Sequence, residues 1–154
     1  MNAGTQRVAQ VLRERGHTGD IVELPQSAHT AAQAAAALGC SADQIAKSLV
    51  FRTASGEAVL VIASGSGRVD ETRLAEVVGE PVALADAEFV RERTGFAIGG
   101  VAPVGHLEPL PVWIDEALLR HETLWAAAGH PRTVFRLTPD ELLSLTAGRV
   151  IAVR

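Results

Sequence analysis

Residues 48–63 read SLVFRTASGEAVLVIA, two apolar and partly β-branched runs on either side of Ser55-Gly56. Runs of this length and composition are typical of strands, and the central Ser-Gly pair favours a turn, so the segment predicts a β-hairpin. A hairpin joins antiparallel neighbours, whereas a strict β-α-β alternation would give a parallel sheet. The sequence therefore predicts an α/β (mixed α+β) fold with a mixed, largely antiparallel sheet and helices around it.

Capping residues mark the helices on both sides of the hairpin. Thr30 and Gln33 form a capping box before an alanine-rich run that Gly39 ends, and Thr138-Pro139-Asp140-Glu141 combines a second capping box with Pro at the first helical position. Helices are expected over residues 6–15, 30–39, 70–79 and 86–94 and after residue 138, with a short helical segment at 41–44. Asp70 and Asp86 are the expected caps of the helices that they begin. Strands are expected over residues 20–24, 48–53, 58–63, 96–98, 112–114, 133–137 and 150–153.

Length, composition and charge exclude several classes of protein. The chain has 154 residues, 47% hydrophobic and 21% charged, which suits one domain with a core, and we expect residues 1–154 to form a single domain. A net charge of −4 argues against binding polyanions through an overall basic surface. Cys40 is the sole cysteine, and we find neither a signal peptide nor an apolar run long enough to span a membrane. We therefore expect a cytoplasmic location, with neither DNA nor a membrane as a partner.

Lys47 is the one lysine among the 14 Lys and Arg residues of the chain. It lies in Gln44-Ile45-Ala46-Lys47-Ser48-Leu49-Val50-Phe51, between the short helical segment and the first strand of the hairpin. The apolar residues after it would anchor the strand and fix the lysine stem, which carries a compact positive charge. Taken alone, the pattern favours an ordinary surface lysine at the start of a strand.

A glycine-rich loop is the second unusual feature. Residues 95–105 read GFAIGGVAPVG, with four glycines and one proline in eleven residues. The backbone of such a loop can approach a ligand closely, and its N–H groups can orient a carbonyl or a phosphate without a catalytic side chain. The alternative, a tight turn between strands, fits the residues equally well.

Other catalytic patterns are missing from the sequence. It contains no phosphate-binding P-loop, no Gly-x-Ser-x-Gly elbow, no pair of cysteines and no His-Glu-x-x-His metal motif. The five histidines are scattered, and none has the spacing of a metal-ligand pair. We therefore expect no metal site and no cofactor.

Together, the lysine segment and the loop resemble the YbaK/EbsC family, which includes the domains associated with prolyl-tRNA synthetase. The resemblance extends over nearly the whole chain in the same order. It is carried by Thr30-Ala31-Ala32, by residues 44–50, by the loop 95–105, by Val112-Trp113-Ile114-Asp115 and by Ala127-Ala128-Gly129-His130. It implies a single mixed α/β domain around a curved sheet. It also implies hydrolysis of mischarged tRNA, mainly tRNA for proline, without a metal or a covalent intermediate.

The resemblance also implies site residues. Lys47 occupies the position of the family's functional lysine, and a Gly-x-x-x-Pro loop would hold the substrate near its ester, here Gly99, Gly100, Val101, Ala102 and Pro103. A ribose hydroxyl of the tRNA would help to activate water. Candidate substrate-binding residues are Thr30, Ser48, Asp115, Gly129 and His130. His130 resembles a histidine that contacts the amino acid in alanine-specific relatives. Thr30 and Ser48 also have structural interpretations, helix capping and packing on the strand surface.

The functional hypothesis from sequence is a trans-acting hydrolase that removes a small amino acid, such as alanine or cysteine, from mischarged tRNA. Its partners would be aminoacyl-tRNA and, as a further candidate, prolyl-tRNA synthetase. Two alternatives stay open. One is a non-catalytic module that binds a nucleotide or an aminoacyl group, and the other is a structural partner of a synthetase. The presence of both Lys47 and the glycine-rich loop favours the enzyme.

Overall fold

The predicted hairpin is confirmed in the computed structural model, which describes residues 2–17, 19–26 and 28–153. Strand β2 (Ile45–Thr53) pairs antiparallel with β3 (Ala58–Ser64), in a register that runs from Ala46 opposite Ser64 to Arg52 opposite Ala58. Gly56 has φ 88° in the connecting turn, a conformation that glycine adopts without steric strain. Every residue of β3 is buried, so this strand runs through the centre of the molecule.

The sheet is mixed, as the hairpin implied. Its described strands follow the order β1-β7-β6-β2-β3-β5-β8, and β4 pairs with β2 beside this path. Four of the pairings are antiparallel and three are parallel. The other strands are β1 (Ile21–Glu23), β4 (Val82–Leu84), β5 (Val112–Asp115), β6 (Leu124–Ala127), β7 (Thr133–Leu137) and β8 (Arg149–Ile151).

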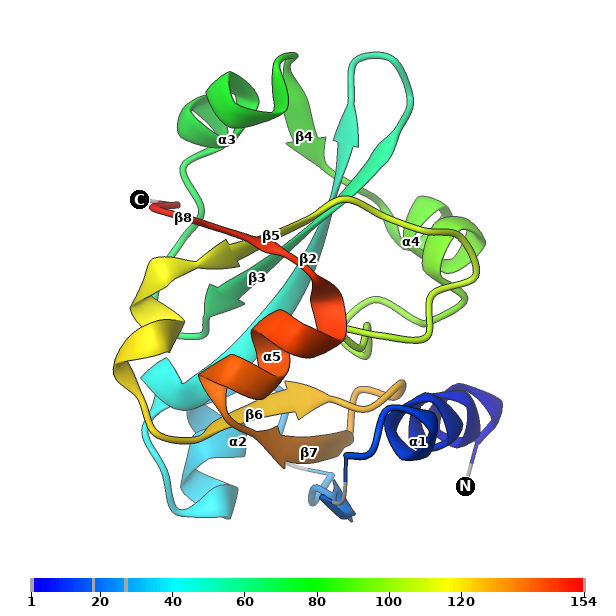
Figure 1. Ribbon diagram of the computed structural model, residues 1–154, viewed down its shortest axis with the longest axis vertical. Coiled ribbons are helices and arrows are strands. Elements are labelled where there is room, and N and C mark those ends of the chain that lie inside the picture. Colours follow the sequence, from blue (N-terminus) through cyan, green and yellow to red (C-terminus); the bar gives the residue numbers. More distant parts are fainter. Residues whose placement is uncertain (1, 18, 27, 154) are drawn as a thin grey trace.

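Helices surround this sheet (Figure 1). They are α1 (Ala3–Glu14), α2 (Ala31–Leu38), α3 (Glu71–Val78), α4 (Ala87–Thr94) and α5 (Pro139–Thr146), with short 3-10 helices at η1 (Ala42–Gln44) and η2 (Glu116–Arg120). The predicted caps are confirmed: the side chains of Thr30, Asp70, Asp86 and Thr138 accept hydrogen bonds from the first turns of their helices. In the described part of the chain, no helix is both long and apolar enough to span a membrane.

The core lies on both faces of β3 because side chains alternate along a strand. Leu60 and Ile62 belong to the larger apolar cluster, which also contains residues of α1, α4 and α5. Val59 and Val61 belong to a second cluster on the other face, with Leu74 of α3. The hairpin thus separates two cores, and covering helices are needed on each side.

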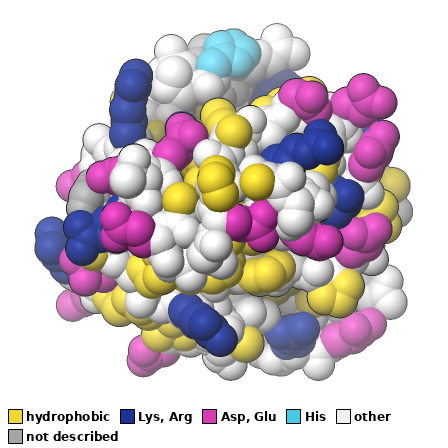
Figure 2. Space-filling view, turned by 90° about the horizontal axis from the view of Figure 1, so that it is seen from above, with side chains coloured by type: hydrophobic (Ala, Val, Ile, Leu, Met, Phe, Trp, Pro, Cys, Tyr) yellow, Lys and Arg dark blue, Asp and Glu magenta, His cyan; other side chains and the backbone are white. Residues whose placement is uncertain are grey.

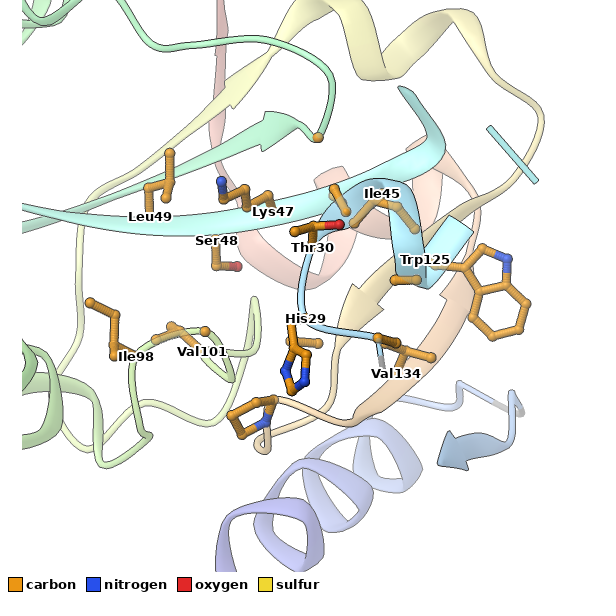
Figure 3. A pocket seen from close by; sticks show the side chains of 18 of the residues that line it. His29, Thr30, Ile45, Lys47, Ser48, Leu49, Ile98, Val101, Trp125 and Val134 are labelled. Carbon is orange, nitrogen blue, oxygen red and sulfur yellow. The ribbon is translucent and has the colours of Figure 1, made fainter. Parts of the chain in front are cut away.

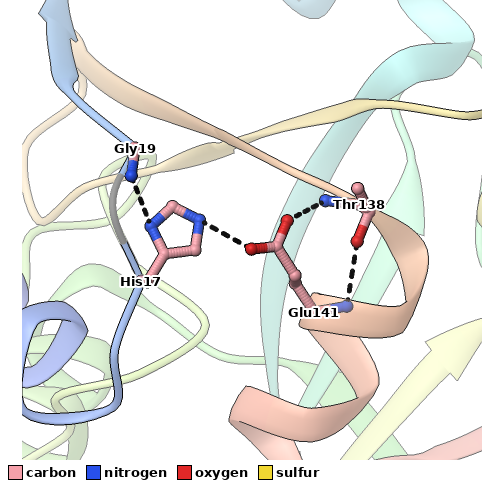
Figure 4. A network of polar contacts seen from close by, with 4 residues as sticks. All are labelled: His17, Gly19, Thr138 and Glu141. Carbon is pink, nitrogen blue, oxygen red and sulfur yellow. Dashed lines mark hydrogen bonds and ion pairs between the residues drawn. The ribbon is translucent and has the colours of Figure 1, made fainter.

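A polar network ties the start of α5 to the segment that follows α1 (Figure 4). The backbone of Thr138 donates to Glu141 Oε1 at 2.8 Å, and Oε2 of the same carboxylate lies 3.5 Å from His17 Nε2. His17 Nδ1 accepts the backbone N–H of Gly19 at 3.1 Å, and its ring packs edge-on against Phe135 at 5.5 Å. The side chain of His17 is only 4% exposed and that of Glu141 is 44% exposed, so the contact lies at the edge of the core.

One predicted strand, at residues 96–98, is wrong. Phe96 is buried, its N–H bonds to Thr94 Oγ1 at 3.0 Å, and the next residues form a turn. Strands β4 and β6 were not predicted, and the ends of several other elements differ by one to three residues. Short strands carry little periodicity, and their pairing partners are far away in sequence.

Candidate active site: a notch in the sheet beside Lys47

The site is at a gap in the pairing of β2. One edge of β2 is paired with β3, while the other edge pairs with β6 at Ile45 and Ala46 and with β4 from Phe51 to Thr53. Residues 47–49 between these contacts have no strand partner on that edge among the described residues. We call this gap the notch. Its unpaired backbone is a natural place for a ligand to bind.

A cavity of about 590 Å³ opens at the notch (Figure 3). It is lined by residues of β2, of β6 and of the N-terminal end of α2. Ile98, Gly99 and Val101 of the glycine-rich loop also line it. Most of the lining side chains are small and aliphatic. Its size is within the range of about 300–1,000 Å³ that is common for small-molecule sites.

The cavity has two sides because it passes across the edge of β2. Lys47 and Ser48 are neighbours in a strand, so their side chains point in opposite directions, as Figure 3 shows. On the Lys47 side lie the start of α2 and an apolar cluster that contains Ile45 and Trp125. On the Ser48 side lie members of the main core, such as Val101.

Lys47 supplies the permanent charge of the cavity. It is exposed, and the described lining residues include neither an Asp nor a Glu. In the part of the chain that the structure describes, Lys47 makes no ion pair. An ammonium group that no carboxylate opposes can stabilise negative charge on a bound group.

The glycine-rich loop closes the Ser48 side through a tight turn. Gly100 donates its N–H to Ala97 O at 2.9 Å, and Gly99 between them has φ 85°. A positive φ at the third position of a turn is the type II pattern, which requires glycine or asparagine. Gly99 and Val101 line the cavity, whereas Gly100, Ala102 and Pro103 lie behind them.

Gly100 packs against the backbone of the protein itself, a role that the loop sequence did not indicate. A Cβ at this position would lie 2.7 Å from the backbone of both His130 and Pro131. The loop therefore packs directly on the backbone at residues 130–131, and Pro131 itself lines the cavity. This close contact fixes the loop relative to β6 and β7.

His106 supports the same loop from behind. Its Nε2 lies 2.7 Å from Ala102 O, so the ring donates a hydrogen bond to that carbonyl, and the ring packs edge-on against Phe96. Burial lowers the pKa of His106, the bond to Ala102 opposes this change, and the charge of Arg7 lowers the pKa further.

We expect His106 to make stability depend on pH. The unfolded chain binds the proton more readily than the folded protein, so the free energy of unfolding should fall as the pH drops below the ordinary value of 6.5 towards the lower folded pKa. Thermal melting from about pH 7.5 to about pH 5 should show a steeper loss for the parent than for His106→Gln, which keeps an N–H donor. Parallel curves would contradict this role.

Thr30 and Ser48, two of the predicted substrate-binding residues, line the cavity. Thr30 also caps α2: its Oγ1 accepts the N–H of Gln33 at 3.1 Å. The hydroxyl of Ser48 is buried and, among the described side chains, is the one such polar atom without a hydrogen-bond partner.

Three other predicted residues lie outside the cavity lining. Asp115 is buried, and its carboxylate accepts the backbone N–H groups of Ser64 at 3.0 Å and Ala117 at 2.9 Å, so it joins the ends of β3 and β5. Gly129 has φ 93°, and a Cβ there would lie 2.6 Å from the backbone of Gly4. The ring of His130 accepts the N–H of Arg132 at 3.0 Å. None of the three lines the cavity, and their contact with a substrate stays a prediction.

The structure adds residues that the sequence did not indicate. His29, Trp125 and Ile98 line the cavity, each from a different segment (Figure 3). His29 directly precedes the cap of α2, and nothing in its spacing separates it from the other histidines. Among the described residues, no three His, Cys, Asp or Glu side chains lie close enough together to hold a metal ion.

The comparison with known families identifies the class of protein. The sequence model of the aminoacyl-tRNA editing domain matches residues 25–145. The chain belongs to this family, the YbaK/EbsC family of aminoacyl-tRNA editing domains, which is related to the editing domains of prolyl-tRNA synthetases.

Individual relatives cover most of the chain. It is 34% identical over 131 residues to the uncharacterized protein YwhH of Bacillus subtilis, an alignment that covers 85% of this chain and 83% of YwhH. It is 27% identical over 123 residues to EbsC of Enterococcus faecalis, named as a candidate Cys-tRNA(Pro)/Cys-tRNA(Cys) deacylase, over 79% of this chain and 75% of EbsC. The crystal structure of a candidate trans-editing enzyme for prolyl tRNA synthetase superposes with a TM-score of 0.94 at 47% identity, covering 100% of this chain and 98% of that one.

Proposed function

We propose that the chain is a trans-acting hydrolase that removes a small amino acid, such as alanine or cysteine, from mischarged tRNA for proline. The observation that carries this proposal is the unopposed positive charge of Lys47, in a cavity that has small aliphatic walls and that the glycine turn also lines. Family membership gives the substrate class, aminoacyl-tRNA. The names of EbsC and of the trans-editing structure support tRNA for proline as the target.

The proposed chemistry is attack of water on the ester that joins the amino acid to the terminal ribose. Negative charge develops on the ester carbonyl oxygen, and Lys47 would stabilise it. The backbone of the turn at Gly99 would position the ester, and a ribose hydroxyl of the tRNA would help to activate the water. The products are the free amino acid and uncharged tRNA.

Such an enzyme meets a clear need. A synthetase pocket shaped for proline cannot reject smaller amino acids well, because small apolar differences are worth only about 1–3 kcal/mol. A second site that hydrolyses the wrong product corrects the error. We place this activity in the cytoplasm, where tRNA is charged, and consider prolyl-tRNA synthetase a candidate partner.

A deacylation assay with a panel of mischarged tRNAs tests the proposal. We expect release of small amino acids from tRNA for proline well above the spontaneous rate. Binding of aminoacyl-tRNA without hydrolysis of any member would instead establish a non-catalytic module.

We also expect tRNA binding that is weak and salt-sensitive. Acidic and basic side chains are mixed on the face in Figure 2, so phosphate contacts should be few and local. Arg52, Arg132 and Arg136 are the candidates. Arg52 stacks over Phe89 at 5.0 Å, Arg132 lies 3.9 Å from Glu23, and Arg136 is exposed on β7.

The affinity for tRNA should fall by about 0.7–0.9 log units per log unit of salt for each phosphate contact. Arg136→Ala should lower that slope by about one contact. Binding measured over a salt series checks both. An affinity that does not change with salt would argue for a free small molecule as the substrate.

A further inference from the structure

Arg7 of α1 joins the two ends of the glycine-rich loop at residues 95–105. Its Nε donates to Gly105 O at 2.6 Å, and its Nη2 donates to Thr94 O at 3.4 Å. The guanidinium carries five N–H donors in a fixed planar fork, so one side chain can hold two carbonyls at once. In the described part of the chain no carboxylate forms an ion pair with Arg7, so its donors are directed to the backbone of the loop.

The same guanidinium packs against the first buried side chain of the loop. Its Cζ lies 4.6 Å from the centroid of the Phe96 ring, and Phe96 is only 1% exposed. A cation over an aromatic face is attracted to it. A Cβ at Gly95 would lie 2.6 Å from Arg7 Nη2, which shows how closely the arginine and the loop fit together.

Helix α1 also contacts the turn at residues 129–133, against which the loop packs. A Cβ at Gly4 would lie 2.6 Å from Gly129 O, so the two backbones touch. The hydroxyls of Thr5 and Thr133 are hydrogen-bonded at 3.2 Å, and Thr5 is fully buried. One helix therefore holds both the loop and the turn, and residues of both segments line the cavity.

Neither the sequence nor the family match indicated a role for α1 at the site. The helix ends at Glu14, before residues 25–145 that the family model matches. It lies next to the loop that follows α4 (Figure 1). Arg7 itself is partly buried and does not line the cavity, so it can act on a substrate only through the loop.

We propose that Arg7 is a positioning residue for the hydrolysis: by joining the ends of the loop, it holds the turn at Gly99 where the ester must lie. This inference rests on the proposed function and gives α1 a part in it. Without the guanidinium the ends keep the bond from Leu107 N–H to Thr94 O at 3.1 Å, but Gly105 O loses its partner and the turn can shift. A misplacement of about 1 Å at a reacting group can slow a reaction about a hundredfold.

The test uses single-turnover deacylation of alanyl- and cysteinyl-tRNA for proline over a series of protein concentrations. Arg7→Ala should lower the rate at saturating protein by about tenfold or more, with the half-saturating concentration nearly unchanged. Arg7→Lys keeps the charge but not the fork, so its rate should lie between those of the parent and Arg7→Ala. Arg13→Ala removes an exposed arginine from the same helix and should keep the parental rate.

The imidazole of His106 reports on the contact independently of activity. Burial is the largest cause of its lowered pKa, the bond to Ala102 opposes this change, and the charge of Arg7 lowers the pKa further. In an NMR titration Arg7→Ala should therefore raise the pKa of His106, whereas Arg7→Lys should keep it closer to the parental value. The same pKa in the parent and Arg7→Ala would show that the guanidinium does not lie beside the loop in solution.

The outcomes separate this role from the proposed function. If the parent hydrolyses neither ester, the proposed function fails and the positioning role falls with it, whatever the titration shows. If the parent is active and folded Arg7→Ala keeps its rate, or loses only affinity for tRNA, the function stands and the positioning role is overturned. Thermal melting checks the fold of each variant. If Arg7→Ala is unfolded at the assay temperature, Arg7→Lys decides, and a parental rate in that variant overturns the role.

Discussion

Lys47→Ala should slow deacylation of mischarged tRNA by two or more powers of ten while the protein stays folded. The lysine provides the one permanent charge in the cavity lining, and no carboxylate of the lining neutralises it. A preorganised charge of this kind contributes roughly 3–4 kcal/mol in the transition state. The side chain is exposed, so its removal should leave the melting temperature nearly unchanged.

Single-turnover rates on one mischarged tRNA measure this effect. Lys47→Met keeps the apolar stem and removes only the charge, so it should be about as slow as Lys47→Ala. Arg149→Ala removes one exposed positive charge from β8 at the far edge of the sheet and should keep the parental rate. A parental rate in Lys47→Ala would show that the lysine is an ordinary surface residue.

Gly100→Ala should have the second largest effect, through the shape of the loop. Its new Cβ would lie 2.7 Å from backbone atoms of residues 130 and 131, which cannot rotate away as a side chain can. Crowding of a packed interior costs about 1–3 kcal/mol, so we expect a clear loss of thermal stability. The loop must also move away from β7, which displaces Gly99 and Val101 at the cavity and should lower activity more than tenfold.

Two neighbouring variants separate loop shape from stability. At Gly99 a Cβ meets nothing within 4 Å, but φ is +85°, so Gly99→Ala should cost about 1 kcal/mol through backbone strain in the turn that faces the cavity. Val101→Ala keeps the backbone, but this side chain is 2% exposed, so the variant should lose about 2 kcal/mol of stability. If Gly100→Ala melts like the parent and hydrolyses at the parental rate, the contact with residues 130–131 has no importance for the site.

The elements with strong local signals were predictable from the sequence. The hairpin followed from two apolar runs around Ser55-Gly56, and the helix starts followed from capping side chains such as Thr30 and Asp86. The strand predicted at residues 96–98 was wrong because apolar residues between glycines resemble a short strand. Here the flanking glycines, Gly95 and Gly99, have positive φ and form turns. The strand order could not be predicted, since β6 and β4 reach β2 from distant parts of the chain.

The site was predictable only in part, for the same reason. Lys47 and the glycine-rich loop were found because their residue types are unusual in this chain. The notch arises from missing strand pairing, which leaves no mark in the local sequence. His29 and Trp125 were overlooked because only the fold brings them to the cavity at the notch. For His130 the structure adds a packing role, because the backbone at residues 130–131 contacts the loop at Gly100. The contact of its side chain with substrate stays a prediction.

The central claim is that this chain hydrolyses wrongly charged tRNA and spares the correct product. The most direct measurement gives the parent protein tRNA for proline charged with cysteine, alanine or proline, and follows each ester in separate single-turnover reactions. The account predicts rapid release of the small amino acids and a prolyl ester that decays at its spontaneous rate. Spontaneous decay of all three esters, or equal hydrolysis of the prolyl ester, would contradict it.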